Sequence, residues 1–219
     1  MNDLRSVLPS LGLTEERCGG NRGSYLDPAE LGLYRWILRS FASGGSHSGQ
    51  AVADAAKSLR VDAAAALNRM VEGDLIQCSA SGDIECAYPF SAKPTTHVVT
   101  LDTGVRLYAM CAVDALGIPV MLEQSCLVET ADPVDATPIS VQVAVTGEAQ
   151  AMPDGAVVLS AVASGPGPLS ALCCPLVNTF KSAASAERFL ATEPELSGTI
   201  LSIAEADQRG AAVFGGVLG

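Results

Sequence analysis

Apolar residues recur at helical spacing through the first third of the chain. From Pro28, the segment LGLYRWILRSF brings several of them close to one face. The polar segment FASGGSHSGQ interrupts this pattern, and SGQAVADAAKSL and VDAAAALNRMVEGDLI predict two more helices with a tight joint near Arg60 and Val61. The residues expected on the buried face of the first helix are Leu31, Leu33, Trp36, Ile37 and Phe41.

A β-hairpin is predicted directly after the third helix. In IQCSASGDIECAYPF, two short apolar runs flank the turn-forming letters SGD. The order helix, helix, helix, hairpin resembles a winged-helix module, which usually binds DNA. The third helix, however, offers only Arg69 centrally, beside Asp62, Glu72 and Asp74. A helix that reads phosphates is basic, so we expect a structural use of this module.

The second half of the chain combines strands with helices. HVVTLDTG predicts a strand and turn, and RLYAMCAVDALG predicts a short helix ended by Gly117 and Pro119. AVVLSAVAS and TILSIAEA predict further strands, with a helix over SAERFLAT between them. ISVQVAVTG predicts a strand with one buried face, because apolar residues alternate with small or polar ones: Ile139, Val141, Val143 and Val145 against Ser140, Gln142, Ala144 and Thr146.

These elements predict an α+β fold in two parts. Residues 1–82 form a three-helix, winged-helix-like module, within which residues 1–25 are loosely ordered or form a short helix. Residues 83–219 form a second domain with a mixed or antiparallel sheet and flanking helices.

The charge balance narrows the choice of partners. With 13 Lys and Arg against 24 Asp and Glu, the formal net charge is −11, which repels nucleic-acid phosphates and anionic lipid headgroups. The opening segment MNDLRSVLPSLGLTEER lacks the apolar core of a secretory signal, and no apolar stretch reaches the roughly 18 residues of a membrane span. We therefore expect a cytoplasmic protein that binds neither nucleic acid nor membrane.

Seven cysteines are the main candidates for chemistry. An odd number without an export signal predicts free thiols in a reducing compartment. No CxxC pair occurs and the two histidines, His47 and His97, lie outside the cysteine segments, so a tetrahedral zinc site is poorly supported. The cysteines are Cys18, Cys78, Cys86, Cys111, Cys126, Cys173 and Cys174.

Cys111 and Asp114 stand out within the apolar segment LYAMCAVDALG. On a helix, residues three apart share a face, so the thiol and the carboxyl group would lie side by side in an apolar setting. A charge there is costly to bury unless it is paired or protonated. The alternative is a purely structural pair: a cysteine that packs as a small hydrophobe and an aspartate that caps backbone groups.

The adjacent pair Cys173 and Cys174 could supply a second thiol. In a strand the two side chains would point to opposite faces, so at most one would face a given pocket; two buried, inert thiols are the other interpretation. Together with Cys111 and Asp114, one member of the pair would make a site of two sulfurs and one oxygen. Soft thiolates select soft metals such as Cu(I), Zn and, by the same logic, mercury.

At these residues the chain resembles the organomercurial lyase family. RLYAMCAVDALGIPVML is similar to the family's LYAxCAxDxL-type segment, and the CC pair followed by NTFKSAASAERFLATEPELSGTILSIAEA matches in order and spacing, over roughly residues 84–210. The resemblance implies that Cys111 and Cys173 are the two catalytic cysteines, Asp114 the catalytic aspartate and Cys126 a structural cysteine. The remaining cysteines Cys18, Cys78 and Cys86 match no family feature.

Two positions depart from the family pattern. Met110 stands where an aromatic residue often precedes the first cysteine, and Pro175 follows the pair where a histidine can occur. Both leave the implied triad intact, and both bear on the shape of the pocket and on substrate preference.

The resemblance implies protonolysis of a carbon–mercury bond without a cofactor. An alkyl- or arylmercury substrate arrives as a thiol adduct, and Asp114, whose acid form desolvation favours, moves the proton. Hg(II) remains between Cys111 and Cys173, near Asp114, until an exogenous thiol or a mercuric reductase accepts it. Two other functions stay open: a soft-metal-sensing transcription factor, and a soft-metal carrier of the same fold.

Overall fold

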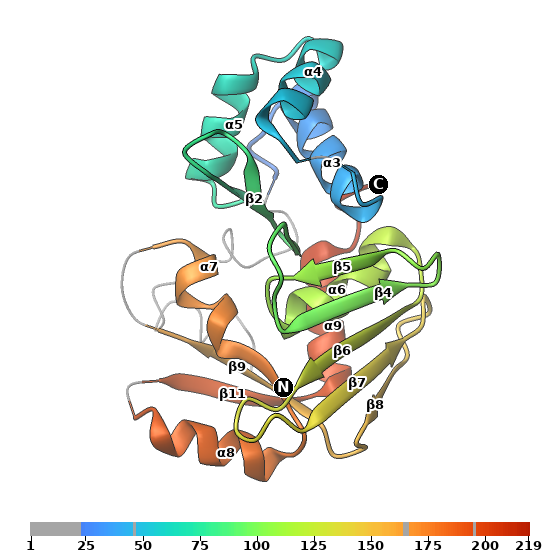
Figure 1. Cartoon of the computed structure of the whole chain (residues 1–219), viewed down its shortest axis with the longest axis vertical. Coiled ribbons are helices and arrows are strands. Elements are labelled where there is room, and N and C mark those ends of the chain that lie inside the picture. Colours follow the sequence, from blue (N-terminus) through green and yellow to red (C-terminus); the bar gives the residue numbers. More distant parts are fainter. Residues whose placement is uncertain (1–22, 46, 164–166, 195) are drawn as a thin grey trace.

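The computed structural model describes residues 23–45, 47–163, 167–194 and 196–219, and it confirms an α+β fold. A group of three helices stands at one end of the molecule, above a large antiparallel sheet and a smaller sheet (Figure 1). Residues 1–22, which include Cys18 and most of the segment expected to be loose, lie outside the described residues. Within the described part, no helix combines the length and apolar character that crossing a membrane requires.

The three N-terminal helices begin at capping residues. The Asp27 side chain accepts hydrogen bonds from the first-turn backbone of α3, and the Glu30 carboxylate accepts one from the Asp27 backbone N–H, which makes a capping box. Arg60 adopts the left-handed conformation between the second and third helices, so the predicted tight joint is confirmed. The helices are α3 (Pro28–Ala42), α4 (Gly49–Leu59) and α5 (Ala63–Glu72).

The large sheet continues from the predicted hairpin. β1 and β2 pair antiparallel around the SGD turn, as predicted, and every further pairing in the sheet is also antiparallel. The sheet order is β1-β2-β3-β5-β4-β6-β7-β8. Its strands are β1 (Ile76–Cys78), β2 (Ile84–Ala87), β3 (Phe90–Ser91), β4 (His97–Leu101), β5 (Arg106–Ala109), β6 (Cys126–Ala131), β7 (Pro138–Val143) and β8 (Ala149–Met152).

The alternation predicted for β7 holds over most of its length. Ile139, Val141 and Val143 are buried while Gln142 is exposed. Val145 was expected on the same buried face, but its side chain is 50% exposed. The strand ends at Val143, so Val145 lies in the turn that follows and no longer obeys the strand's period of two.

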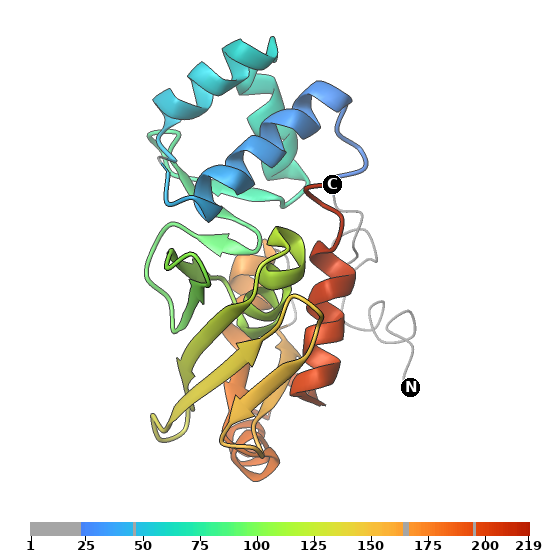
Figure 2. The same cartoon turned by 90° about the vertical axis from the view of Figure 1, so that its right-hand side faces the viewer.

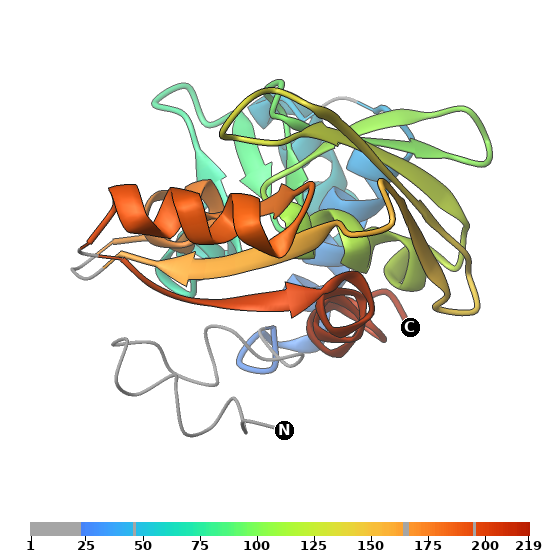
Figure 3. The ribbon, with the colours of Figure 1, turned by 90° about the horizontal axis from the view of Figure 1, so that it is seen from below.

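The small sheet has the order β10-β9-β11 and is covered by α8 (Ala183–Thr192) (Figure 3). The predicted strand over TILSIAEA is only half correct. The strand stops at Ser202, whose side chain caps a new helix in a capping box with Glu205. The elements are β9 (Val157–Val162), β10 (Val177–Phe180), β11 (Ser197–Ser202) and α9 (Ile203–Phe214).

Helices α6 (Ala112–Leu122) and α9 lie between the two sheets (Figures 1 and 3). The predicted helix over RLYAMCAVDALG starts too early, because Arg106–Ala109 forms β5, and it ends too early, because α6 continues through Gly117 and Pro119. Gly117 is needed for packing rather than termination: a Cβ there would lie 2.4 Å from the Phe214 side chain and 2.9 Å from the Gly210 carbonyl of α9.

The C-terminal end of the chain returns to the N-terminal helices. Arg35 and Arg39 of α3 each donate a 2.8 Å hydrogen bond to a tail carbonyl, on Val217 and Leu218 respectively. Figure 2 shows α9 running along the sheets toward α3. The tail therefore ties α3 to α9 and so to the sheets that α9 contacts.

Candidate active site

Cys111 is placed by the junction between β5 and α6. It is the N-cap of α6, in extended backbone, and its sulfur accepts a 3.4 Å hydrogen bond from the Asp114 backbone N–H. The expected proximity to Asp114 therefore arises from a helix cap rather than from two positions inside a helix. An anion at this position is favoured by the helix dipole, which is a common way to stabilise a thiolate.

A cluster of two sulfurs and one carboxylate is buried beside this cap. The potential ligand atoms of Cys111, Asp114 and Cys174 all lie within 4.8 Å of one another. The Cys174 thiol donates a hydrogen bond to Asp114 Oδ2 over 3.9 Å. The exposed fractions of the three residues are 5%, 7% and 6%, so the cluster is shielded from bulk water.

Burial keeps both thiols protonated in the resting protein. It raises the pKa of Cys111 well above the ordinary value, an effect strengthened by the hydrogen bond that this thiol donates to Cys174 and by the Asp114 charge. That same hydrogen bond lowers the pKa of Cys174, but burial and the charge of Asp114 raise it, to about 11. The hydrogen bond between the two thiols therefore favours the thiolate of Cys174 over that of Cys111, and Asp114 Oδ2 lies within hydrogen-bonding distance of the Cys174 thiol.

The structure places the two neighbouring cysteines differently from a strand. Cys173 ends the short helix α7 (Leu169–Leu172), and Cys174 begins a 3₁₀ turn, Cys174–Leu176; β10 starts only at Val177. As expected, one thiol of the pair faces the cluster. That thiol is Cys174, whereas Cys173 is half-buried and lies outside the three-residue group. Sequence spacing gave no signal to choose between them.

The other described cysteines are not members of the three-residue cluster. Cys126, at the start of β6, is buried, and burial raises its pKa to about 12, which fits the structural role implied by the resemblance. Cys86 is buried in β2 and Cys78 is partly buried in β1. His97 is buried too, and its burial lowers its pKa to about 4, so this imidazole is neutral near pH 7.

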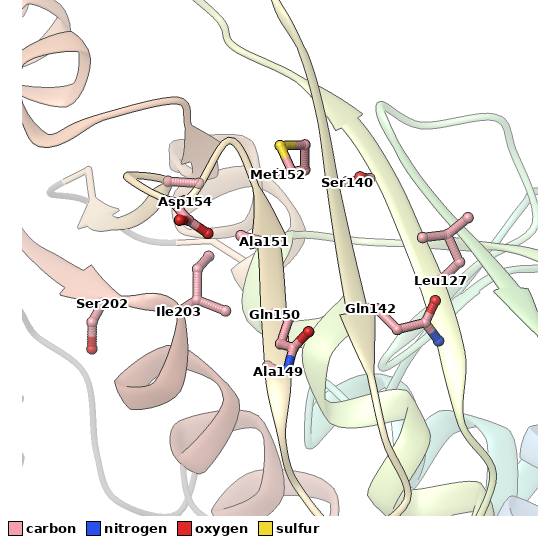
Figure 4. Close-up of a pocket in the computed structure, with 11 residues that line it drawn as sticks. Leu127, Ser140, Gln142, Ala149, Gln150, Ala151, Met152, Asp154, Ser202 and Ile203 are labelled. Carbon is pink, nitrogen blue, oxygen red and sulfur yellow. The ribbon is translucent and has the colours of Figure 1, made fainter.

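A large open cavity lies elsewhere on the molecule. It has a volume of about 580 Å³, and it is formed over β6, β7 and β8 with the start of α9 (Figure 4). Its lining includes Gln142, Gln150, Met152 and Asp154, and among the residues that the structure describes no thiol or histidine contributes to it. The cavity is therefore separate from the cluster of Cys111, Asp114 and Cys174.

The buried cluster fits one class of protein: an α+β protein with two thiols and one carboxyl group that could hold a soft metal. Two sulfurs select soft cations, and a carboxylate in contact with one of them can accept and return a proton.

The comparisons with known proteins identify the family. The model of the alkylmercury lyase family matches residues 90–215, and the chain belongs to this family. It is therefore a lyase for carbon–mercury bonds, and the matched range contains the whole cluster. The fold is also similar to a solved structure described as the mercury-bound form of MerB2, with a TM-score of 0.73 and 20% identity over 87% of this chain and 92% of the other. Comparison with curated proteins gave no match.

Proposed function

We propose that Cys111, Cys174 and Asp114 carry out the carbon–mercury cleavage, with Cys174 in the role that sequence resemblance suggested for Cys173. The observation that carries this proposal is the contact between the Cys174 thiol and Asp114 Oδ2, next to the Cys111 sulfur. In this proposal Cys173 is not a catalytic residue; it is the C-cap of α7.

The reaction can be written so that protons balance. In the first step, the organomercurial group moves from its thiol adduct to one cysteine. The thiol of the adduct leaves as R′SH, with the proton of that cysteine. The second cysteine passes its proton to Asp114 and bonds to mercury, which raises the electron density on carbon. Asp114 then protonates that carbon, the hydrocarbon leaves, and Hg(II) stays bound to two thiolates. The Cys174–Asp114 contact favours Cys174 as the second cysteine.

Product release follows from the strength of thiolate–mercury bonds. Hg(II) held by two sulfurs leaves only when another thiol takes it, so we expect a requirement for excess exogenous thiol, or transfer to a mercuric reductase. No cofactor enters this scheme. A reducing cytoplasm would keep both cysteines available.

We assign the N-terminal part to a winged-helix-like module, residues 1–82, attached to a lyase domain, residues 83–219. The order α3, α4, α5 and the β1–β2 hairpin supports this assignment. The division falls in the hairpin turn, so the module would share one sheet with the lyase domain. The acidic side chains of α5 and its flanks favour a structural role over nucleic-acid binding.

The test of the proposed function is release of hydrocarbon. Purified protein, reduced and supplied with excess thiol, should release benzene from phenylmercury and methane from methylmercury, measured by gas chromatography. Binding of Hg(II) with no hydrocarbon from either substrate would instead identify a carrier.

A further inference from the structure

Asp74 is a buried carboxylate that the reaction scheme does not use. It follows α5 and lies in the left-handed backbone region, with φ +55°, a conformation that aspartate tolerates better than most residues. Its Oδ2 accepts a 2.8 Å hydrogen bond from the backbone N–H of Leu169, the first residue of α7. A residue of the helical end of the molecule therefore holds the start of the segment that leads to Cys174.

Tyr88 makes a second attachment to the same segment. Its buried hydroxyl oxygen accepts a 2.7 Å hydrogen bond from the backbone N–H of Ser170 and donates one to Asp74 Oδ1 over 3.4 Å. Burial raises the pKa of this hydroxyl, so it keeps its proton and can donate while it accepts. Asp74 and Tyr88 thus bind the first two N–H groups of α7 and each other.

The attachments are connected to the cluster by a few covalent and hydrogen bonds. The Leu169 carbonyl accepts a 2.9 Å hydrogen bond from the Cys173 N–H, and Cys174 is the next residue. The Cys173 carbonyl in turn accepts a bond from Leu176, which closes the 3₁₀ turn that begins at Cys174. With α7 only four residues long, its position is fixed by these end contacts more than by its own length.

We propose that Asp74 and Tyr88 are positioning residues, which fix α7 and thereby hold the Cys174 sulfur at the distance from Cys111 that two-coordinate mercury requires. The inference rests on the proposed role of Cys174. It also gives the helical end of the molecule a function in the reaction: Asp74 and Tyr88 lie on the segments that connect α5 to β1 and β2 to β3. Residues that orient metal ligands in this way typically contribute about 10–100-fold to metal affinity or activity.

The test compares how strongly three variants retain Hg(II) against a competing thiol. Tyr88→Phe removes both hydroxyl bonds, and Asp74→Asn replaces the carboxylate with an amide that tolerates the same left-handed backbone. Tyr34→Phe is the matched control, because its buried hydroxyl bonds the Tyr88 carbonyl over 3.3 Å and not α7. Each protein is loaded with Hg(II) and titrated with a competing small thiol. The mercury content of the protein after removal of small molecules reports retention, and thermal unfolding reports stability.

The proposal expects Tyr88→Phe and Asp74→Asn to retain Hg(II) about 10–100-fold more weakly than the unmodified chain, while Tyr34→Phe matches it at a similar loss of stability. Equal retention in Tyr88→Phe and Tyr34→Phe would overturn it, as would losses that only follow the melting temperature. Asp74→Asn decides the result if Tyr88→Phe does not fold. Hg(II) retention needs no turnover, so a failure of positioning is distinguishable from a failure to release hydrocarbon.

Discussion

At the scale of single residues, adjacent cysteines in the chain have different surroundings. Cys173 and Cys174 are neighbours, and it is the Cys174 thiol that donates a hydrogen bond to Asp114, at the point where the chain changes from α7 to a 3₁₀ turn. The hydrogen bond from Cys111 also favours the thiolate of Cys174. For the proposed binding of a soft cation between two sulfurs, Cys174 is therefore the member of the pair that lies close enough to Cys111.

Serine substitutions separate the two neighbours. We expect Cys174→Ser to lower hydrocarbon release by at least about 10³-fold, as is typical when a catalytic nucleophile is removed. Cys173→Ser should keep most of the activity, because its thiol lies outside the cluster. Both variants are assayed in single turnover with phenylmercury. An inactive Cys173→Ser together with an active Cys174→Ser would return the role to Cys173.

Substitution of Asp114 separates proton transfer from metal binding. Asp114→Asn keeps both thiols and nearly the same shape, so Hg(II) should still bind at one ion per chain. Hydrocarbon release should fall by about 10²–10⁴-fold, the usual contribution of general acid–base catalysis. The paired measurement is mercury content and single-turnover product from preloaded substrate. Undiminished release by the Asn variant would leave the two thiols to explain the chemistry alone.

At the scale of elements, α6 is held against α9 by a pair of glycines. A Cβ on Gly210 would lie 2.7 Å from the Gly117 nitrogen and 2.8 Å from the Val113 carbonyl, and backbone atoms of this kind cannot move aside. Because Cys111 is the N-cap of α6, the crossing of these helices also bears on the position of its thiol.

Gly210→Ala should therefore destabilise the protein by about 1–3 kcal/mol, the usual cost of overpacking, although alanine favours helix by itself. Gly32→Ala in α3 is the control, since a Cβ there meets only side-chain atoms of Leu59 at 3.9 Å or beyond. Urea unfolding measures both. A Gly210→Ala protein as stable as the control would show that the helices separate at little cost.

At the scale of the whole molecule, buried thiols make stability depend on alkaline pH. The folded pKa values of Cys174 and Cys126 are about 11 and 12, and that of Cys111 is raised as well. An unfolded chain ionises its thiols near 9, so above that pH the unfolded state binds fewer protons than the folded state. The change of the unfolding free energy with pH is then negative, so the folded state becomes less stable as pH rises.

Unfolding free energies should decline between about pH 9 and 11 by up to about 1.4 kcal/mol per pH unit for each buried thiol. Urea titrations in reductant across this range measure the slope. Cys126→Ala should start from a lower stability at pH 7 and lose it less steeply, because one of the ionising thiols is gone. A slope unchanged by that substitution would mean that Cys126 does not take part in the linkage.

Local sequence pattern was sufficient to predict the elements that are determined by residues within the same segment. The helices α3, α4 and α5, the hairpin and the alternating part of β7 follow from caps, turns and apolar spacing. The segment around Cys111 and Asp114 also carried its chemistry in the sequence, because a carboxyl group in an otherwise apolar run has few stable explanations.

Other features depended on contacts between distant segments. Gly117 and Pro119 resemble a helix end, and only the approach of α9 explains why α6 continues through them. Local pattern likewise did not distinguish Cys173 from Cys174, and the family resemblance pointed to Cys173. In the structure it is the Cys174 thiol that contacts Asp114, on a segment whose start is hydrogen-bonded to Asp74 and Tyr88, some 80 to 95 residues earlier. Sequence by itself determined which groups could react, because reactivity belongs to the side chain. Tertiary structure decided which of them meet, because holding Hg(II) between two sulfurs requires a fixed separation of those sulfurs that only long-range packing can set.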